Sequence, residues 1–292
     1  MRRNRLSKQI PAVSLLTGAM VWGLIWYPYR VLSSVGMEGW LSLTLSYLFA
    51  LVPSLVLFRK PLFAAGFSPL LAAIGLSAGL CNIGYVLAML GGEVMRVLLL
   101  FYMAPLWTVL LSRILLGERL DATGHLVILT SFAGAVAMLW SPSEGSIFPE
   151  NHAEWLGLAS GFMFALSNVL AKRGESIPVE ARSASVSAGV VAAGIVLAFF
   201  QHGPIWHGIT GYTILINFLM GGAIFAVNVV MQHGLSHTPA NRAIVILLFE
   251  LVVAAVSSYF LAGEAMTLQE WAGGSLIVSA SILSGKIGKD QG

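Results

Sequence analysis

The stretch Leu116-Gly117-Glu118-Arg119 returns in shortened form as Ala262-Gly263-Glu264, and this repetition decides the fold. The two copies lie 146 residues apart in a chain of 292. Each copy follows a long apolar run and precedes another, as a tight turn at a membrane surface would. A repeat at half the chain length predicts that one structural unit is present twice, and such repeats determine the architecture.

The composition is that of a membrane protein. Hydrophobic residues make up 57% of the chain and charged residues 10%, and the mean hydropathy is +0.84. Soluble proteins carry about 25% charged residues. Apolar runs of roughly 18 to 22 residues recur, and each can cross a hydrocarbon core of ~30 Å. Because these runs are continuously apolar rather than alternating, they predict an all-α polytopic membrane protein and not a β-barrel.

We expect ten transmembrane helices, arranged as two five-helix repeats around a central cavity. The longest connection, residues 141–154, separates a first repeat at 1–143 from a second at 144–292. The first apolar run is too long for a signal peptide core, so we expect it to be retained. The expected spans are roughly 11–34, 40–58, 68–90, 94–113, 123–141, 153–172, 183–201, 212–232, 240–261 and 269–286.

The distribution of basic residues predicts the orientation. With ten spans and a cytoplasmic N-terminus, fourteen of the sixteen Lys and Arg residues fall on the cytoplasmic side, as the positive-inside rule requires. The other two, Arg30 and Arg96, fall near the outer ends of helices. We therefore expect a multi-pass protein of the cell inner (plasma) membrane with both termini in the cytoplasm. The net charge of +3 lies in short loops and does not indicate nucleic acid as a partner.

A shift of 146 residues aligns residues 71–133 with the second half without a gap, and the start of each half aligns at a slightly different offset. Five spans per half is an odd number, so the second half must be inserted upside down relative to the first. Inverted repeats are the usual build of secondary transporters, with the substrate site near the middle of the membrane between the halves. The matched positions are Gly75/Gly221, Asn82/Asn228, Arg96/Arg242, Ser112/Ser258, Leu115/Leu261, Gly117/Gly263 and Glu118/Glu264.

These features resemble the drug/metabolite transporter superfamily with two EamA-type repeats. The most typical segment runs from Ala104-Pro105-Leu106 to Leu116-Gly117-Glu118, whereas the second copy has Glu250-Leu251 in place of Ala104-Pro105. Within the superfamily the chain looks most like the YddG-like branch of aromatic amino-acid exporters. The resemblance implies a secondary transporter that exports small metabolites, above all neutral or aromatic amino acids, by alternating access.

Other functions remain open at this stage. A sugar, nucleotide-sugar or drug could be the substrate, although a phosphate ligand would call for a basic residue in mid-membrane, and none is present. A structural membrane protein is the non-transport alternative. An intramembrane enzyme would need paired Asp, a Ser/His arrangement or HExxH inside the membrane, whereas Glu250 is a lone carboxylate. Six scattered histidines predict no metal site, and we expect no cofactor and a monomeric protein whose partners are its small-molecule substrate and the bilayer.

Glu250 is the most informative candidate site residue. It lies eight residues beyond Arg242, so it should be about 12 Å deeper in the membrane at 1.5 Å per residue. A carboxylate at that depth must be protonated, paired or in contact with water. It predicts a group that carries a proton or binds the amino group of a substrate, and the alternative is a structural acid bonded to a neighbouring helix.

The other candidate substrate-binding residues are amides and aromatics within the spans. Amides offer both donors and acceptors to a zwitterion, and aromatic walls suit a partly apolar ligand. Each could instead serve packing or an interhelical hydrogen bond. Among the small residues, the pairs Gly75/Gly79 and Gly157/Gly161 predict close helix packing. The polar and aromatic candidates are Trp22, Asn82, Tyr85, Tyr102, Asn168 and Asn228.

Overall fold

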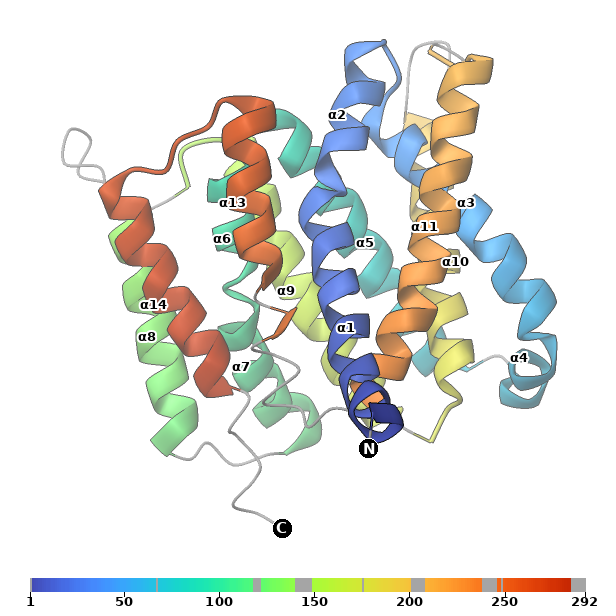
Figure 1. Ribbon diagram of the computed structural model, residues 1–292, viewed down its shortest axis with the longest axis horizontal. Coiled ribbons are helices and arrows are strands. Elements are labelled where there is room, and N and C mark those ends of the chain that lie inside the picture. The colour runs from blue at the N-terminus through green and yellow to red at the C-terminus, as the bar shows by residue number, and fades with distance from the viewer. Residues whose placement is uncertain are drawn as a thin grey trace.

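The computed structural model describes residues 2–66, 68–117, 122–139, 149–174, 176–200, 208–237, 246–247 and 249–284, and these form a bundle of helices without strands (Figure 1). Both α1 and α14 have their chain-terminal ends at the same end of the bundle (Figure 1). The helices are α1 (Arg2–Leu24), α2 (Trp26–Ser34), α3 (Gly39–Leu57), α4 (Arg59–Ala65), α5 (Pro69–Gly91), α6 (Val94–Phe101), α7 (Ala104–Leu116), α8 (Ala122–Leu139), α9 (His152–Arg173), α10 (Val179–Phe200), α11 (Gly211–Ser236), α13 (Phe249–Ala262) and α14 (Leu268–Ser284).

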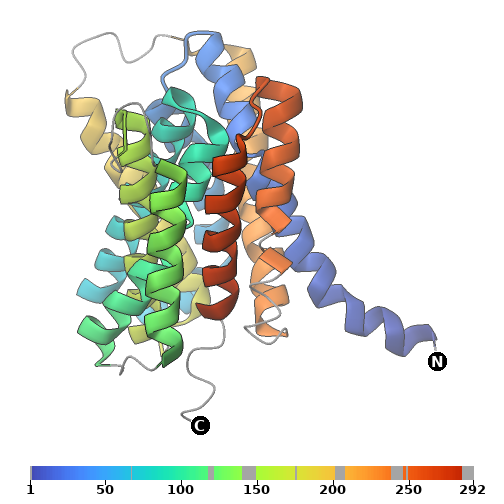
Figure 2. The same cartoon turned by 90° about the vertical axis from the view of Figure 1, so that its left-hand side faces the viewer.

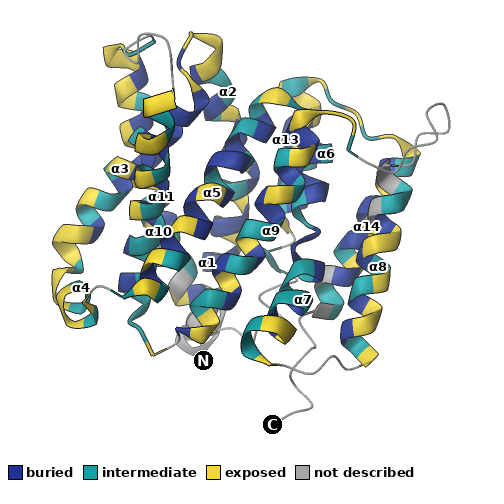
Figure 3. Ribbon diagram, turned by 180° about the vertical axis from the view of Figure 1, so that it is seen from behind, coloured by how far each residue is buried: buried dark blue, intermediate teal, exposed yellow. Residues whose placement is uncertain are grey.

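The helices agree with a polytopic membrane protein. Seven segments of the described chain are long and apolar enough to cross a membrane, and each coincides with a predicted span. Helices also occupy the other three predicted spans, although residues 240–245 of the ninth lie outside the described residues. Exposed positions lie on the outward faces of peripheral helices (Figure 3), and many are large apolar side chains such as Phe199, Phe200 and Phe260. The total of ten spans stays a prediction.

Two of the spans are broken by proline, because proline lacks the N–H that its helix needs. Pro28 cannot donate to the carbonyl of Leu24, and the helix is interrupted at Ile25 between α1 and α2. Pro105 likewise leaves the carbonyl of Phe101 without its partner, and the chain is interrupted between α6 and α7. Pro53, by contrast, lies inside α3 without ending it.

Most helix contacts join the predicted first half of the chain to the second. The helix α5 packs on α9 and α10, while α11 packs on α1 and α3. In the same way α7 packs on α9, and α13 packs on α1. The pairs α3–α10 and α8–α14 complete the set, and α8 and α14 lie side by side in Figure 2. Under the predicted alignment of the halves, contacts such as α5–α10 and α3–α11 correspond to each other, and the inverted repeat itself stays a prediction.

Glycines allow the closest of these contacts. A Cβ at Gly75 would lie 2.6 Å from the carbonyl oxygen of Ser185 on α10. At the aligned position on α11, a Cβ at Gly221 would lie 2.5 Å from the carbonyl oxygen of Ser46 on α3. On α9, a Cβ at Gly161 would lie 2.5 Å from the Phe101 carbonyl oxygen that Pro105 leaves free. The small residues thus bring helix backbones together, as the sequence predicts.

Replacing Gly75 by alanine should therefore destabilise the protein. The new methyl group would press on the α10 backbone, at a cost of about 1–3 kcal/mol. Gly222 is the matched control, since a Cβ there meets no atom within 4 Å and alanine is the better helix former by up to about 1 kcal/mol. Thermal unfolding in detergent should show a lower Tm for Gly75→Ala and an equal or higher Tm for Gly222→Ala. An equal rise in Tm for both variants would contradict the close contact between Gly75 and α10.

Candidate functional site

A carboxylate inside the bundle forms the centre of the candidate site. Glu250 lies near the described start of α13, and residues 246–247 before it are also helical. Its Oε2 atom accepts a hydrogen bond of 3.0 Å from the hydroxyl of Tyr102. The twelve residues from Glu250 to the end of α13 at Ala262 span about 18 Å at 1.5 Å per residue. With Ala262 at the edge of a hydrocarbon core of ~30 Å, this separation predicts that the carboxylate lies deep in the membrane.

The helix break at Pro105 helps to place Tyr102 against this carboxylate. Tyr102 is the residue that ends α6, and its N–H still bonds to the Leu98 carbonyl at 2.9 Å. The side chains of Tyr102 and Glu250 are both half-buried, so the pair keeps an accessible surface. The contact joins the two predicted halves, and among the described residues Glu250 has no cationic partner.

Aromatic rings adjoin the pair. Tyr85 of α5 lies within electrostatic range of Glu250, and its ring packs edge-on against Phe101 at 5.0 Å between centroids. Trp22 of α1 is half-buried and packs against the same core cluster as Tyr85. The backbone of α1 approaches at Gly23, where a Cβ would lie 2.8 Å from the carbonyl oxygen of Glu250. The structure thus brings together Glu250, Tyr102 and Tyr85, with Trp22 on an adjoining helix.

The three predicted amides lie in different surroundings. Asn82 accepts a hydrogen bond of 2.6 Å from the Tyr47 hydroxyl and donates one of 2.8 Å to the Ala78 carbonyl, so its amide has partners within the bundle. Asn168 is exposed on α9. Asn228 lines a pocket between α3, α10 and α11. Tyr47 did not stand out in the sequence, because only folding brings α3 against the polar side of α5.

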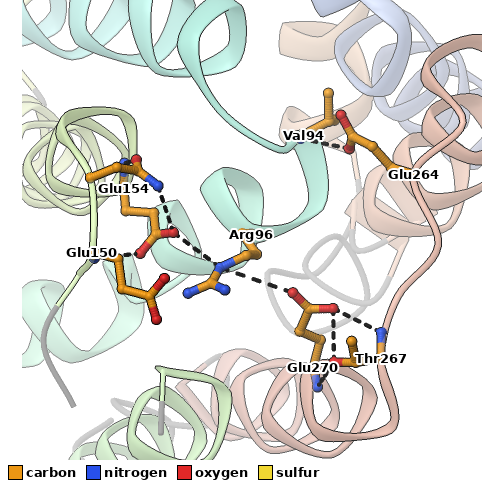
Figure 4. Close-up of polar contacts among 8 residues, drawn as sticks. Val94, Arg96, Glu150, Glu154, Glu264, Thr267 and Glu270 are labelled. Carbon is orange, nitrogen blue, oxygen red and sulfur yellow. Dashed lines mark hydrogen bonds and ion pairs between the residues drawn. The ribbon is translucent and has the colours of Figure 1, made fainter. Parts of the chain in front are cut away.

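The Gly-Glu turn holds helix ends together. Gly117 and Gly263 both end their helices with a φ of +70°, which glycine adopts readily. After the second turn, Glu264 accepts a hydrogen bond of 2.7 Å from the N–H of Val94 at the start of α6 (Figure 4). Its other oxygen lies 3.1 Å from Nη1 of Arg30 on α2. Glu118 lies outside the described residues, so the corresponding contact of the first copy stays untested.

Arg30 binds several groups at this end of the bundle. Its Nε donates to the carbonyl of Met89 at 3.0 Å, and its Nη2 donates to the carbonyl of Gly92 at 2.6 Å. Its guanidinium carbon lies 5.0 Å from the ring centroid of Trp26. One guanidinium thus links α2, the end of α5 and the turn after α13, which come from both predicted halves.

A second arginine lies among carboxylates nearby. Nε of Arg96 lies 3.1 Å from Glu154 and 4.0 Å from Glu270 (Figure 4). Glu154 also accepts from the backbone N–H of Glu150, and Glu270 accepts from the backbone N–H of Thr267. These two carboxylates therefore fix the starts of α9 and α14 around α6. The sequence placed Arg96 near a helix end but did not reveal its acidic partners.

Two comparisons with known proteins match transporters by description, and a third shows a shared fold. Residues 152–285 match the EamA-like transporter family. A protein of Archaeoglobus fulgidus described as an uncharacterized transporter is 27% identical over 203 residues, or 68% of this chain and 70% of that protein. A solved crystal structure superposes with a TM-score of 0.59 over 96% of this chain and 98% of that chain, at 17% identity, which shows the fold alone.

Residues 152–285 are thus similar to the EamA-like family that the sequence resembles, and the relative is also described as a transporter. The matched family and relative are transporters by description, which fits a protein that is not an enzyme. Together with the apolar helices they indicate a multi-pass membrane protein. The similarity to aromatic amino-acid exporters is a finer prediction that these comparisons do not reach.

The contact between Arg30 and Glu264 should contribute to stability in a measurable way. In a double-mutant cycle with Arg30→Gln and Glu264→Gln, we expect a coupling free energy of about 1–2 kcal/mol, because each side chain is the partner of the other. Arg30→Gln with Glu180→Gln, at the opposite end of the bundle, serves as the control and should be additive within about 0.5 kcal/mol. The free energies of unfolding are measured in detergent. If the effects of the two substitutions add in the Arg30/Glu264 cycle as they do in the control cycle, the two side chains are not coupled.

Glu93, between α5 and α6, predicts a pH dependence of stability. Loss of hydration raises the pKa of its carboxyl above the ordinary value; Glu270 raises it further, Arg96 lowers it, and Glu264 and Glu154 raise it. Above this raised pKa the charged form destabilises the folded state, and the cost disappears as the pH falls through it. Glu93→Gln should therefore raise the Tm at pH 8 and raise it progressively less toward pH ~4.3, the ordinary Glu pKa. The control is Glu38→Gln on the exposed start of α3. A Tm gain for Glu93→Gln that is the same at every pH, or that equals the Tm change of the control, would contradict this cause.

Proposed function

We propose that the protein is a secondary transporter that exports small amphipathic metabolites, amino acids above all, by alternating access. The observation that carries the proposal is the hydrogen-bonded pair of Glu250 and Tyr102, which lies deep in the bundle at the meeting of the two halves. Secondary transporters built from inverted repeats bind their substrates at such a position. The EamA-like match to residues 152–285 supports the same function.

The chemistry of the pair favours a substrate with an ammonium group. A carboxylate in hydrocarbon needs a partner of opposite charge or a proton, and Glu250 has no cationic partner among the described residues. An ammonium ion would supply that charge, and the Tyr102 hydroxyl is already oriented toward the carboxylate. Tyr85 and Trp22 would cover the apolar part of the ligand. Asn82, Asn168 and Asn228 remain candidate contacts of the substrate elsewhere along its route.

The arrangement of helices supports alternating access. The contacts between α5 and α10, and between α3 and α11, exchange with one another when the halves are exchanged. Two halves packed in this way can form two arrangements of similar energy, one open to each side of the membrane. A phosphate-bearing substrate fits less well, because the charged side chain at the centre of the described bundle is an acid. Export, the inner membrane and cytoplasmic termini complete the proposal on the strength of the sequence pattern and its resemblance.

The test is transport by purified protein in vesicles. Glu250→Gln keeps the size and the hydrogen-bonding capacity of the side chain and removes its charge. A hydrogen bond to a charged group contributes about 1.5–3 kcal/mol, so amino-acid transport should fall by about 10- to 100-fold. Glu38→Gln, on the exposed start of α3, is the matched control and should transport as wild type does. An unchanged rate and pH dependence for Glu250→Gln would overturn the role of this carboxylate.

A further inference from the structure

A second polar site lies away from Glu250, at the end of the bundle where α4 follows α3 (Figure 1). A pocket of about 170 Å³ opens there between α3, α10 and α11. An engineered cavity of about 150 Å³ accommodates benzene, so the pocket can hold a small organic molecule. Its lining residues are Ala50, Ser54, Phe58, Val179, Glu180, Ser183, Ser187, Phe225, Asn228 and Val229.

Three polar residues of α10 share the face that lines the pocket. Glu180, Ser183 and Ser187 are spaced by three and four residues, which places them along one side of a helix. Asn228 lies across from them on α11. None of these four side chains has a hydrogen-bond partner among the described residues, although Ser187 is only 3% exposed. Polar groups without partners in such a place await a ligand or water.

The comparison of Asn228 with its counterpart sharpens this point. Asn82, at the aligned position of the first half, bonds to Tyr47 and Ala78 and so is satisfied by the protein itself. Asn228 has the same amide and no such partner among the described residues. Asn228 is half-buried and lines the pocket, so its amide is accessible from the pocket. The first amide is therefore already satisfied within the bundle in this structure, while the second is free to bind a molecule in the pocket.

The lining determines the chemistry of that molecule. Glu180 is the charged residue among those that line the pocket, and it accepts hydrogen bonds when ionised. Arg182 is turned elsewhere, since its Nη1 donates to the Ala171 carbonyl on α9 at 2.9 Å. The rings of Phe58 and Phe225 pack at 6.1 Å between centroids and form an apolar wall. A primary ammonium group with a short apolar chain matches these features.

We infer that this pocket is a second binding site, specific for small molecules with a primary ammonium group, in which Glu180 binds the ammonium and Asn228 orients the ligand. The inference rests on the proposed function in one respect, because the expected occupant of the pocket is a transported amino acid. At the predicted cytoplasmic end, the pocket would collect substrate before it reaches Glu250. The ethanolamine headgroup of a membrane lipid carries the same ammonium and is the other source of a ligand.

The test uses 3-methylbutylamine as the probe and 3-methylbutan-1-ol as its uncharged match. Titration calorimetry is carried out on the full chain carrying Glu250→Gln, in phosphatidylcholine nanodiscs, so that the carboxylate in the middle of the bundle does not contribute. We expect one equivalent of amine to bind and the alcohol to bind at least about 10-fold more weakly. Adding Glu180→Gln or Asn228→Ala should weaken amine binding by about 10-fold or more, while adding Glu38→Gln should leave it unchanged.

Two further arms identify the source of the ligand. Competition by L-leucine, without an effect of phosphatidylethanolamine in the nanodiscs, would assign the pocket to the free amino acid. Competition by phosphatidylethanolamine would assign it to the lipid headgroup and still support an ammonium site. Equal binding of amine and alcohol, or unchanged amine binding in Glu180→Gln with an unchanged Tm, would overturn the inference. The proposed function is tested separately: if the second site is overturned but the Glu250→Gln variant loses transport, the proposed function still stands.

Discussion

Hydrocarbon offers no water to a polar group, so a polar side chain within the bundle must find its partner on another part of the protein or on a ligand. Most of the described polar groups follow this constraint through local or interhelical bonds. Ser42 and Ser46 of α3 both bond to Asn217 of α11 at 2.9 Å, and the Trp26 indole bonds to Ser257. The exceptions therefore carry information. Among the exceptions in the part of the chain that the structure describes, Glu250 has no cationic partner and Asn228, which lines a pocket, has no hydrogen-bond partner.

The end of the bundle with the Gly-Glu turn obeys the same constraint by different means. Charged side chains there bind backbone groups that the helix ends leave open. Glu264 accepts from the N–H of Val94, while Arg30 donates to the carbonyls of Met89 and Gly92. These contacts connect elements of both predicted halves at this end of the bundle. The turn from which the sequence repeat was recognised is thus a joint between the halves rather than a binding site.

Local patterns in the sequence were sufficient for the helices but not for their partners. Apolar length predicted the spans, the spacing of Gly75 and Gly79 predicted close packing, and Gly263 predicted a sharp turn, because each depends on nearby residues. The pairing of Asn82 with Tyr47 and of Arg30 with Glu264 depends on which helices meet and in what register. A single sequence does not contain that information in a local form. The effect of proline was also context-dependent: Pro28 and Pro105 each follow a break between two helices, whereas α3 continues through Pro53.

The central claim is that the bundle moves amino acids through a site containing one deep carboxylate. The most direct measurement is counterflow of a labelled amino acid into vesicles that contain the purified wild-type protein, with a panel of unlabelled amino acids, sugars and phosphorylated compounds as competitors and with or without a pH gradient. We expect neutral and aromatic amino acids to compete, and sugars and phosphorylated compounds to have no effect. Counterflow no faster than in protein-free vesicles, or competition by sugars or phosphates alone, would contradict the claim.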